Sequence, residues 1–285
     1  MKKIKAAIIG TGNIGTDLMF KILRSEFIEL VSFVGRREDS PGIQLARKNN
    51  VYTATIGIDF FKNHSNCCQL VFDATDAKTA CRNYPIFKTL NISVIDLTPA
   101  KIGPMCIPSI NGGIIKTNDN INMITCGGQA SIPLLHLLSK RFKNLEYIEV
   151  VSQIASKSAG MATRINIDHY IETTEKAIQQ FTKCNNCKVI LNLNPAEPCV
   201  DMQTTMFIKT KDMDSEGILD ELNNKINELK QYIPNYELTL LPVVNDDGIF
   251  IITVKVRGVG DYLPEYAGNL DIINCAAIEV VKNLL

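Results

Sequence analysis

The sequence predicts an α/β protein in which a doubly wound parallel sheet is followed by a second domain of α+β type. Residues 4–9 form a short apolar run that leads into Gly-Thr-Gly-Asn-Ile-Gly and then into an amphipathic segment. Apolar runs and helical patterns alternate up to residue 126, which indicates parallel strands joined by helices. Further along, apolar runs follow one another with fewer helical patterns, which is typical of an antiparallel sheet layered with helices.

The composition sets limits on function. The chain has 285 residues, of which 46% are apolar, with 30 basic and 30 acidic side chains. This balance favours a compact two-domain enzyme or binding protein over a nucleic-acid or membrane binder. No apolar run approaches the roughly 18 residues of a membrane span, and the first residues have too short an apolar core for a secretory signal. We therefore expect a cytoplasmic protein, whose nine irregularly spaced cysteines are free thiols.

The first element is a strand over residues 4–9, followed by a glycine turn and a helix with apolar positions at Ile14, Leu18 and Ile22. In this Rossmann-type arrangement the three glycines have separate roles, namely a tight turn, close approach to a pyrophosphate, and helix–strand packing. The phosphates would face the start of the helix. The glycines concerned are Gly10, Gly12 and Gly15.

The rest of the first domain continues the alternation, with predicted strands over 28–35, 69–75, 92–98 and 121–127 and a helix over 79–90. Ligands of such sheets bind at the carboxyl ends of the strands. The residues expected there are 73–75, 96–99 and Cys126.

The second strand ends in Gly35, Arg36 and Arg37. NAD-binding versions of this fold usually carry an acidic residue here for the ribose, whereas arginines hold the 2′-phosphate of NADP. The alternative is a solvated basic loop in which Glu38 or Asp39 contacts the ribose. Both cofactors stay open on this evidence.

Cys126 lies between the last strand of the first domain and an apolar run after Pro133 that predicts a helix. In a turn that opens a helix, free N–H groups and the helix dipole favour a thiolate. Gly127 and Gly128 would leave room for a substrate, and the same N–H groups would stabilise an oxyanion. These are the parts needed for covalent attack on a carbonyl.

The other candidate groups indicate packing. Isolated cysteines are common buried residues, and Cys184 and Cys187 form one C-x-x-C without a second pair or a nearby histidine, so a surface turn is expected. The three histidines lack ligand-like spacing. We expect no metal site.

The second half begins with a strand around residues 146–156 and a loop of small residues, 157–166, which suits close approach to a ligand. A helix, further strands and a second helix follow, and the last two strands are joined across Asn-Asp-Asp-Gly. The final residues form a helical pattern expected to pack back on the first domain. The predicted division is 1–126 for dinucleotide binding, 127–266 for catalysis and oligomerisation, and 267–285 for the returning helix.

Seven ordered motifs along nearly the whole chain give a specific resemblance. They are GTGNIGTDLM, DLTPAKIGP, NMITCGGQA, SAG-x-x-TR-x-N-ID, ETT-x-KAI, LNPAEP and YAGNLDI. In this order they resemble the acylating acetaldehyde dehydrogenases of aromatic meta-cleavage pathways, which act in aromatic hydrocarbon catabolism. These enzymes have a plan like that of glyceraldehyde-3-phosphate dehydrogenase.

The resemblance implies an oxidoreductase that converts a short aldehyde and coenzyme A into acyl-CoA with NAD or NADP. It also implies a partner, a 4-hydroxy-2-oxoacid aldolase such as 4-hydroxy-2-oxovalerate aldolase. A homo-oligomer is expected by analogy of fold, because second domains of this kind tend to share exposed sheet edges. Carried over, Cys126 is the nucleophile, which forms a thioester that the CoA thiol cleaves. The implied cofactor contacts, with Arg37 added from the end of the second strand, are Gly10, Thr11, Gly12, Asn13, Ile14, Gly15, Arg37, Ser158, Ala159, Gly160, Met161, Ala162, Thr163, Arg164, Ile165, Asn166 and Asn269.

Three departures from the family pattern bear on activity. Met161 and Ala162 stand where the family usually has proline and glycine. Thr204 stands where it has an aspartate that is credited as the base for the cysteine, and a threonine cannot take that proton. Arg36 and Arg37 stand where it usually has an aspartate at the second position. Glu197 or Asp201 is a candidate substitute base, although a three-residue offset turns Asp201 to the other face of a strand.

Two alternative functions stay open. One is a semialdehyde dehydrogenase that passes its thioester to phosphate. Extra basic residues around the cysteine would favour this function. The other is a weakly active or non-catalytic nucleotide-binding subunit that positions an aldolase, which the missing aspartate supports and the retained cysteine opposes.

Overall fold

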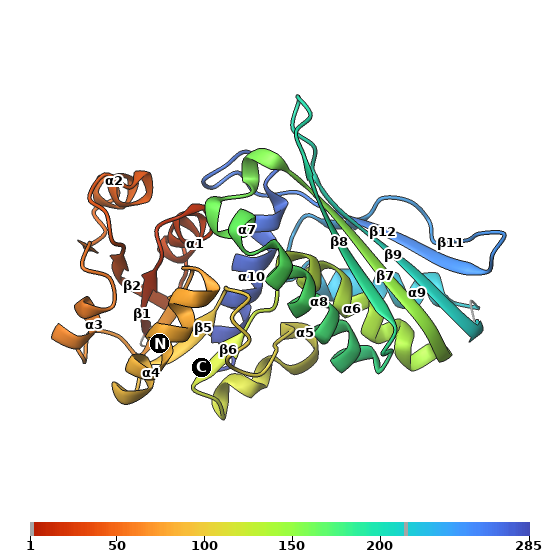
Figure 1. Cartoon of the computed structure of the whole chain (residues 1–285), viewed down its shortest axis with the longest axis horizontal. Coiled ribbons are helices and arrows are strands. Elements are labelled where there is room, and N and C mark those ends of the chain that lie inside the picture. The colour runs from red at the N-terminus through yellow and green to blue at the C-terminus, as the bar shows by residue number, and fades with distance from the viewer. Residues whose placement is uncertain (1–2, 214–215) are drawn as a thin grey trace.

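The computed structural model describes residues 3–213 and 216–285, and these form two sheets with helices around and between them (Figure 1). The first sheet has the strand order β3-β2-β1-β4-β5-β6, and all its strands are parallel. The strands are β1 (Ile4–Ile9), β2 (Ile28–Val34), β3 (Thr53–Ala54), β4 (Leu70–Asp73), β5 (Ser93–Asp96) and β6 (Asn120–Asn122). The predicted doubly wound sheet is confirmed.

Helices fill the connections of this sheet. They are α1 (Asn13–Leu23), α2 (Pro41–Lys48), α3 (Asp59–Asn63), α4 (Ala77–Thr89), α5 (Pro108–Asn111) and the 3-10 turn η1 (Gly112–Lys116). The strands β1 and β4 are buried along most of their length, as expected for parallel strands covered on both faces. The carboxyl ends of β1, β4 and β5 therefore meet at one edge, beside the turn that enters α1.

The second sheet has the order β10-β12-β9-β7-β8, with β11 paired to β12. The elements are α6 (Cys126–Arg141), β7 (Lys143–Ala155), η2 (Ser156–Ser158), α7 (Met161–Ile165), α8 (Ile167–Thr182), β8 (Cys187–Asn194), β9 (Met202–Asp212), α9 (Ile218–Leu229), β10 (Tyr236–Leu238), β11 (Val243–Val244) and β12 (Ile249–Val256). The expectation of an antiparallel sheet is wrong for one pair, because β7 and β8 run parallel and α8 forms the crossover between them.

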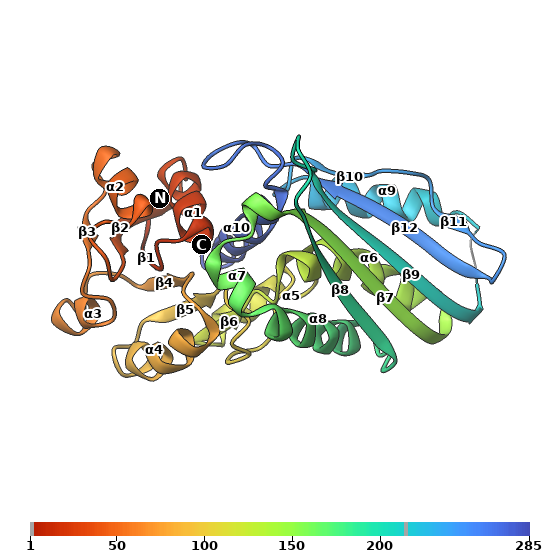
Figure 2. The ribbon, with the colours of Figure 1, turned by 45° about the horizontal axis from the view of Figure 1, so that its top comes forward.

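The long strands of this sheet have period-two burial, and α6, α8 and α9 lie along one face (Figure 2). The predicted strand over 238–244 is interrupted, because Pro242 and the residues around it lie between the short strands β10 and β11. The division of the chain at residues 126 and 266 stays a prediction.

The last helix, α10 (Gly268–Lys282), returns to the first domain and packs on α1, as predicted. Its Asn274 amide donates to the carbonyl of Ile14 at 3.1 Å and to the carboxylate of Asp17 at 2.7 Å. The returning helix therefore ties the glycine turn and its helix to the second sheet.

Candidate active site

The turn between β1 and α1 needs glycine at two positions for reasons internal to the protein. Gly10 has a φ of +108°, and a β-carbon added there would lie 2.4 Å from the carbonyl of Ala74. A β-carbon at Gly15 would lie 1.9 Å from the carbonyl oxygen of Gly10. At Gly12 no atom of the described residues, apart from neighbouring residues of the chain, lies within 4 Å of an added β-carbon, so the space beside this residue is open to a ligand.

Gly12→Ala is therefore expected to leave the melting temperature nearly unchanged while it weakens dinucleotide binding by about tenfold or more, because the methyl group blocks close approach of a pyrophosphate. Calorimetric titration with NAD and NADP measures the effect. Gly113→Ala is the matched control, since a β-carbon at that exposed glycine would also meet no atom of the described residues within 4 Å, apart from its chain neighbours. Unchanged affinity in the Gly12 variant would contradict this role.

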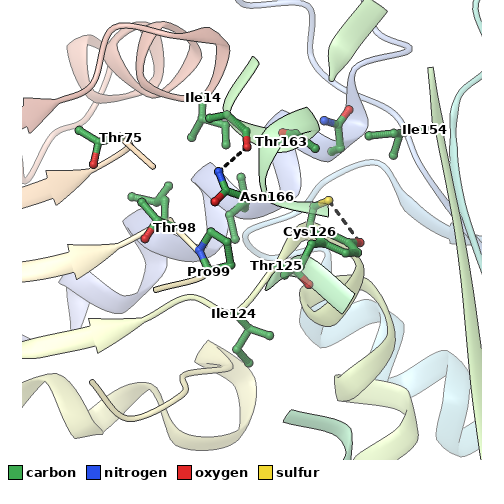
Figure 3. Close-up of a pocket in the computed structure, with 15 residues that line it drawn as sticks. Ile14, Thr75, Thr98, Pro99, Ile124, Thr125, Cys126, Ile154, Thr163 and Asn166 are labelled. Atoms are coloured by element: carbon green, nitrogen blue, oxygen red, sulfur yellow. Dashed lines mark hydrogen bonds between the residues drawn. The ribbon is translucent and has the colours of Figure 1, made fainter. Parts of the chain in front are cut away.

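A cavity of about 70 Å³ lies where the turn, the ends of β4 and β5, α7 and α10 meet (Figure 3). Of the predicted site residues, this cavity collects Ile14, Cys126, Ala162, Thr163, Asn166 and Asn269. Its remaining lining residues are Thr75, Leu97, Thr98, Pro99, Ile124, Thr125, Ile154, Tyr170 and Ile273. The positions of Thr75, Thr98 and Pro99 follow from their places after parallel strands, whereas Tyr170 was missed because its spacing in an amphipathic helix indicated only core packing.

The loop before α8 closes one side of the cavity. The amide of Asn13 donates to the carbonyl oxygen of Ser158 at 3.3 Å, so the loop meets the glycine turn. The guanidinium of Arg164 donates to the carbonyl oxygens of Ser156 and Ala159 and holds the loop in shape. Met161 and Ile165 are 74% and 66% exposed, so their side chains point away from the cavity in this conformation.

Cys126 is the first residue of α6, and Thr125 caps that helix by accepting a hydrogen bond from the N–H of Gly128 at 2.9 Å. The helix thus begins seven residues before Pro133 and runs through it. The cysteine lies at a helix start beside the cavity, and Figure 3 shows its sulfur there.

The expectation that Gly127 and Gly128 leave room for a substrate is wrong. A β-carbon at Gly127 would lie 2.2 Å from the hydroxyl of Tyr170 and 2.6 Å from that of Ser152, and one at Gly128 would lie 2.7 Å from Ile124. Their N–H groups are also engaged, since that of Gly127 donates to the Tyr170 hydroxyl at 3.0 Å. The two glycines make room for the protein's own atoms, and their N–H groups are not free for an oxyanion.

The environment of Cys126 also opposes a ready thiolate. Burial raises the pKa of the thiol to about 11, although hydrogen bonds from Tyr170 and from the backbone of Gly127 act in the opposite direction. The start of a helix therefore does not by itself ionise this cysteine at neutral pH, because desolvation of the anion outweighs the favourable contacts.

The two candidate substitutes for the missing aspartate are engaged elsewhere. Glu197 forms an exposed ion pair with Lys157, and a carboxylate oxygen of Asp201 lies 3.5 Å from Arg257. Neither residue lines the cavity. Thr204 is buried, and its hydroxyl lies 3.0 Å from the hydroxyl of Ser152.

Two buried carboxylates shape the strand ends above the cavity. Asp73 accepts hydrogen bonds from the N–H and hydroxyl of Thr75, and Asp96 accepts from the N–H of Thr98 at 2.8 Å. Burial raises the pKa of Asp73 to about 6 and that of Asp96 to about 7. Through the hydrogen bonds that they accept, the two carboxylates hold in place Thr75 and Thr98, which line the cavity.

Comparison with known proteins relates the two halves to two family models. Residues 5–117 match "Semialdehyde dehydrogenase, NAD binding domain", and residues 126–264 match "Prokaryotic acetaldehyde dehydrogenase, dimerisation". The chain is 51% identical over 281 residues to an acetaldehyde dehydrogenase of Spirochaeta aurantia and 48% identical to one of Burkholderia thailandensis. Each alignment covers 99% of this chain and 94% of the relative.

Two solved structures share the fold of this chain at much lower sequence identity. An aspartate semialdehyde dehydrogenase II from Vibrio cholerae superposes with a TM-score of 0.70 at 12% identity, covering 100% of this chain and 98% of the other. The Candida albicans aspartate semialdehyde dehydrogenase with NADP gives a TM-score of 0.63 at 10% identity, covering 99% of each chain.

Proposed function

The chain belongs to the acetaldehyde dehydrogenase family, and we propose from that premise that it is a CoA-acylating aldehyde dehydrogenase. In the proposed reaction a short aldehyde such as acetaldehyde, CoA and NAD(P)⁺ yield acyl-CoA, NAD(P)H and a proton. The observation that carries the proposal is the position of Cys126, which opens α6 on the cavity beside the glycine turn.

The residues present fit a dinucleotide. Open space beside Gly12, the start of α1 and the adjoining loop at Ser158 form a surface for a pyrophosphate and for the end of a cofactor that reaches into the cavity. The residues proposed to hold the cofactor are residues 10–15, residues 158–166 and Asn269. When bound, a nicotinamide supplies the hydride acceptor for the oxidation.

Cys126 carries the covalent steps in this proposal. Its thiolate forms a C–S bond to the aldehyde carbon, and the carbonyl π electrons move to oxygen. When the C=O bond re-forms, hydride leaves the carbon and a thioester remains on the cysteine. The CoA thiol then loses its proton and attacks the thioester carbon, and Cys126 departs as thiolate.

The cavity lining favours a short aliphatic aldehyde over a charged semialdehyde. Its lining residues include Ile14, Leu97, Ile124, Ile154 and Ile273, and no lysine, arginine, aspartate or glutamate of the described chain is among them. A substrate carboxylate or an attacking phosphate would need cationic partners. This observation favours CoA acylation over transfer to phosphate.

The proposal is tested by absorbance at 340 nm with acetaldehyde or propanal, with CoA or phosphate as acceptor, and with NAD or NADP. Reduced cofactor that forms only with CoA supports it. Formation that depends on phosphate would assign the chain to the semialdehyde class. Cofactor binding without turnover would favour the non-catalytic subunit of an aldolase.

The end of β2 supports a role for Arg36 in holding an NADP 2′-phosphate. Arg37 pairs with Asp39 through two hydrogen bonds, and Glu38 accepts from Arg47 and Thr55. Arg36 has no ion pair within the described parts of the chain. Arg37, the contact predicted from the sequence, is paired with Asp39, whereas Arg36 acts on the carboxylate of Asp76, whose pKa it helps to lower, without an ion pair among the described residues.

Arg36→Ala is therefore expected to raise the KM for NADP by about tenfold or more while changing that for NAD little, because a phosphate loses a charged partner. Initial rates with both cofactors measure the effect, and Arg37→Ala is the matched control with a smaller expected change. An equal rise in the KM for NAD and for NADP would show that Arg36 does not contact a 2′-phosphate.

The chain is proposed to form a homo-oligomer through the open face of the second sheet. Alternate side chains on this face, among them Val151, Phe207 and Ile251, are only partly buried, and no helix covers them within residues 3–213 and 216–285 (Figure 2). The family model that matches this half of the chain has the word "dimerisation" in its description.

An aldolase partner remains a prediction from the resemblance. No helix in the described part of the chain is long and apolar enough to cross a membrane.

A further inference from the structure

A line of hydroxyl groups extends from Cys126 into the second sheet. The sulfur lies 3.7 Å from the hydroxyl of Tyr170, which is hydrogen-bonded to Ser152, and the hydroxyls of Ser152 and Thr204 are 3.0 Å apart. The tyrosine comes from α8, the serine from β7 and the threonine from β9, so three separate elements assemble the line. All three residues are buried.

The backbone fixes the first member of this line. The N–H of Gly127 donates to the Tyr170 oxygen at 3.0 Å, so that oxygen is held beside the sulfur and its own proton remains available to donate. Burial and the neighbouring cysteine raise the pKa of Tyr170 well above its usual value. The phenol therefore stays protonated at any working pH and acts as a donor, not as a base.

None of the described residues that line the cavity is an aspartate, a glutamate or a histidine that could remove the proton from the sulfur. Thr204 occupies the place that the family resemblance gives to an aspartate. A thiolate only accepts hydrogen bonds. With the sulfur ionised, every hydroxyl proton can point the same way, from Thr204 to Ser152, from Ser152 to Tyr170, and from Tyr170 to Cys126.

We propose that Tyr170 activates Cys126 by donating a hydrogen bond to its thiolate, with Ser152 and Thr204 as positioning residues that orient this donor. The inference rests on the proposed function of Cys126 as nucleophile. On ionisation the S–H bond breaks, the electron pair stays on sulfur and the proton passes to the surrounding buffer. Hydrogen bonds to the charged form of a group favour that form, and such bonds are stronger than neutral ones.

Tyr170→Phe is expected to raise the titration midpoint of the Cys126 thiol by about one to two pH units, since a charge-assisted hydrogen bond is lost. The measurement is the rate of iodoacetamide alkylation across pH 6 to 11, followed by mass spectrometry of the peptide that contains Cys126. Because the wild-type midpoint lies near the top of this range, the upward shift is read as an alkylation rate about 10- to 100-fold below that of the wild type at each lower pH. Acyl-CoA formation at pH 7.5 should fall by about 10- to 100-fold, with the KM for the cofactor unchanged.

Tyr236→Phe is the matched control. The buried hydroxyl of Tyr236 lies outside the cavity and donates at 2.6 Å to the carbonyl oxygen of Ala130, which lies in the same helix as Cys126. It should lower the melting temperature without moving the Cys126 titration. Ser152→Ala should give a smaller upward shift than Tyr170→Phe, because the donor keeps its place and loses its orienting partner.

An unchanged Cys126 midpoint in folded Tyr170→Phe protein overturns the inference, as does an equal shift in the Tyr236 control. These alkylation experiments do not depend on turnover. If the wild type shows the Tyr170-dependent titration but makes no acyl-CoA, the proposed function fails while the hydrogen-bond assignment stands.

Discussion

Cys126→Ser is expected to reduce acyl-CoA formation by at least about 10⁴-fold, because an alcohol is a far poorer nucleophile than a thiolate and the described residues that line the cavity include no carboxylate or histidine to activate it. The substitution changes a single atom at the first residue of α6, so the fold should be retained. The expected result is a protein that binds NAD or NADP with wild-type affinity and shows no CoA-dependent absorbance change at 340 nm.

A matched control separates this loss from a general effect of removing a thiol. Cys106→Ser alters a buried cysteine that lies outside the cavity, so turnover should persist at a rate set by the fraction of folded protein. Turnover by the Cys126 variant within tenfold of the wild type would contradict the covalent mechanism.

Lys21→Met is expected to destabilise the protein by about 3–5 kcal/mol, because it leaves three carboxylates without their common cation. The ammonium group of Lys21 lies 2.9 Å from Asp17, 2.8 Å from Asp261 and 2.9 Å from Asp271, and side-chain exposure is 8% or less for all four. The partners come from α1, from the chain after β12 and from α10, so the cluster joins the two ends of the chain.

For a chain of this size the loss corresponds to a fall in melting temperature of roughly 10 °C. Lys62→Met is the control, since its pair with Asp59 is largely exposed and should contribute at most about 1 kcal/mol. Equal melting temperatures for the two variants, measured by calorimetry at pH 7, would show that the buried cluster does not stabilise the attachment of α10.

The elements that the sequence predicts correctly are those determined by residues close together in the chain. The glycines of the first turn, the apolar strands and the helix after them predict the doubly wound sheet, because backbone geometry at Gly10 and Gly15 leaves no space for a side chain. The cysteine at the start of α6 was also predictable from the strand before it and the helix after it.

The chemistry around the cysteine was not predictable in the same way. Tyr170, Ser152 and Thr204 come from α8, β7 and β9. The antiparallel pairing of β7 with β9 sets Ser152 opposite Thr204, and the packing of α8 on α6 places Tyr170 beside Cys126. The sequence suggested that Gly127 serves the substrate, whereas the folded chain uses its missing side chain to admit the Tyr170 hydroxyl. Nothing in the spacing of these residues indicates the contact.

The departures from the family pattern have different physical consequences. Met161 points to solvent, so the bulk added at that position does not fill the cavity, while Ala162 lines it. Thr204 lies behind Ser152, so its effect on the cysteine passes through two other hydroxyls. Thr204 does not line the cavity, so in the proposed arrangement it acts on the sulfur only through Ser152 and Tyr170.

A nucleophilic Cys126 must become acylated during turnover, and mass spectrometry of the protein mixed with acetaldehyde and oxidised cofactor in the absence of CoA detects this directly. We expect an acetyl group on the peptide that contains Cys126, which disappears when CoA is added and acetyl-CoA is released. A protein that reduces the cofactor with acetaldehyde and CoA but never carries an acetyl group on Cys126 would not use this covalent mechanism.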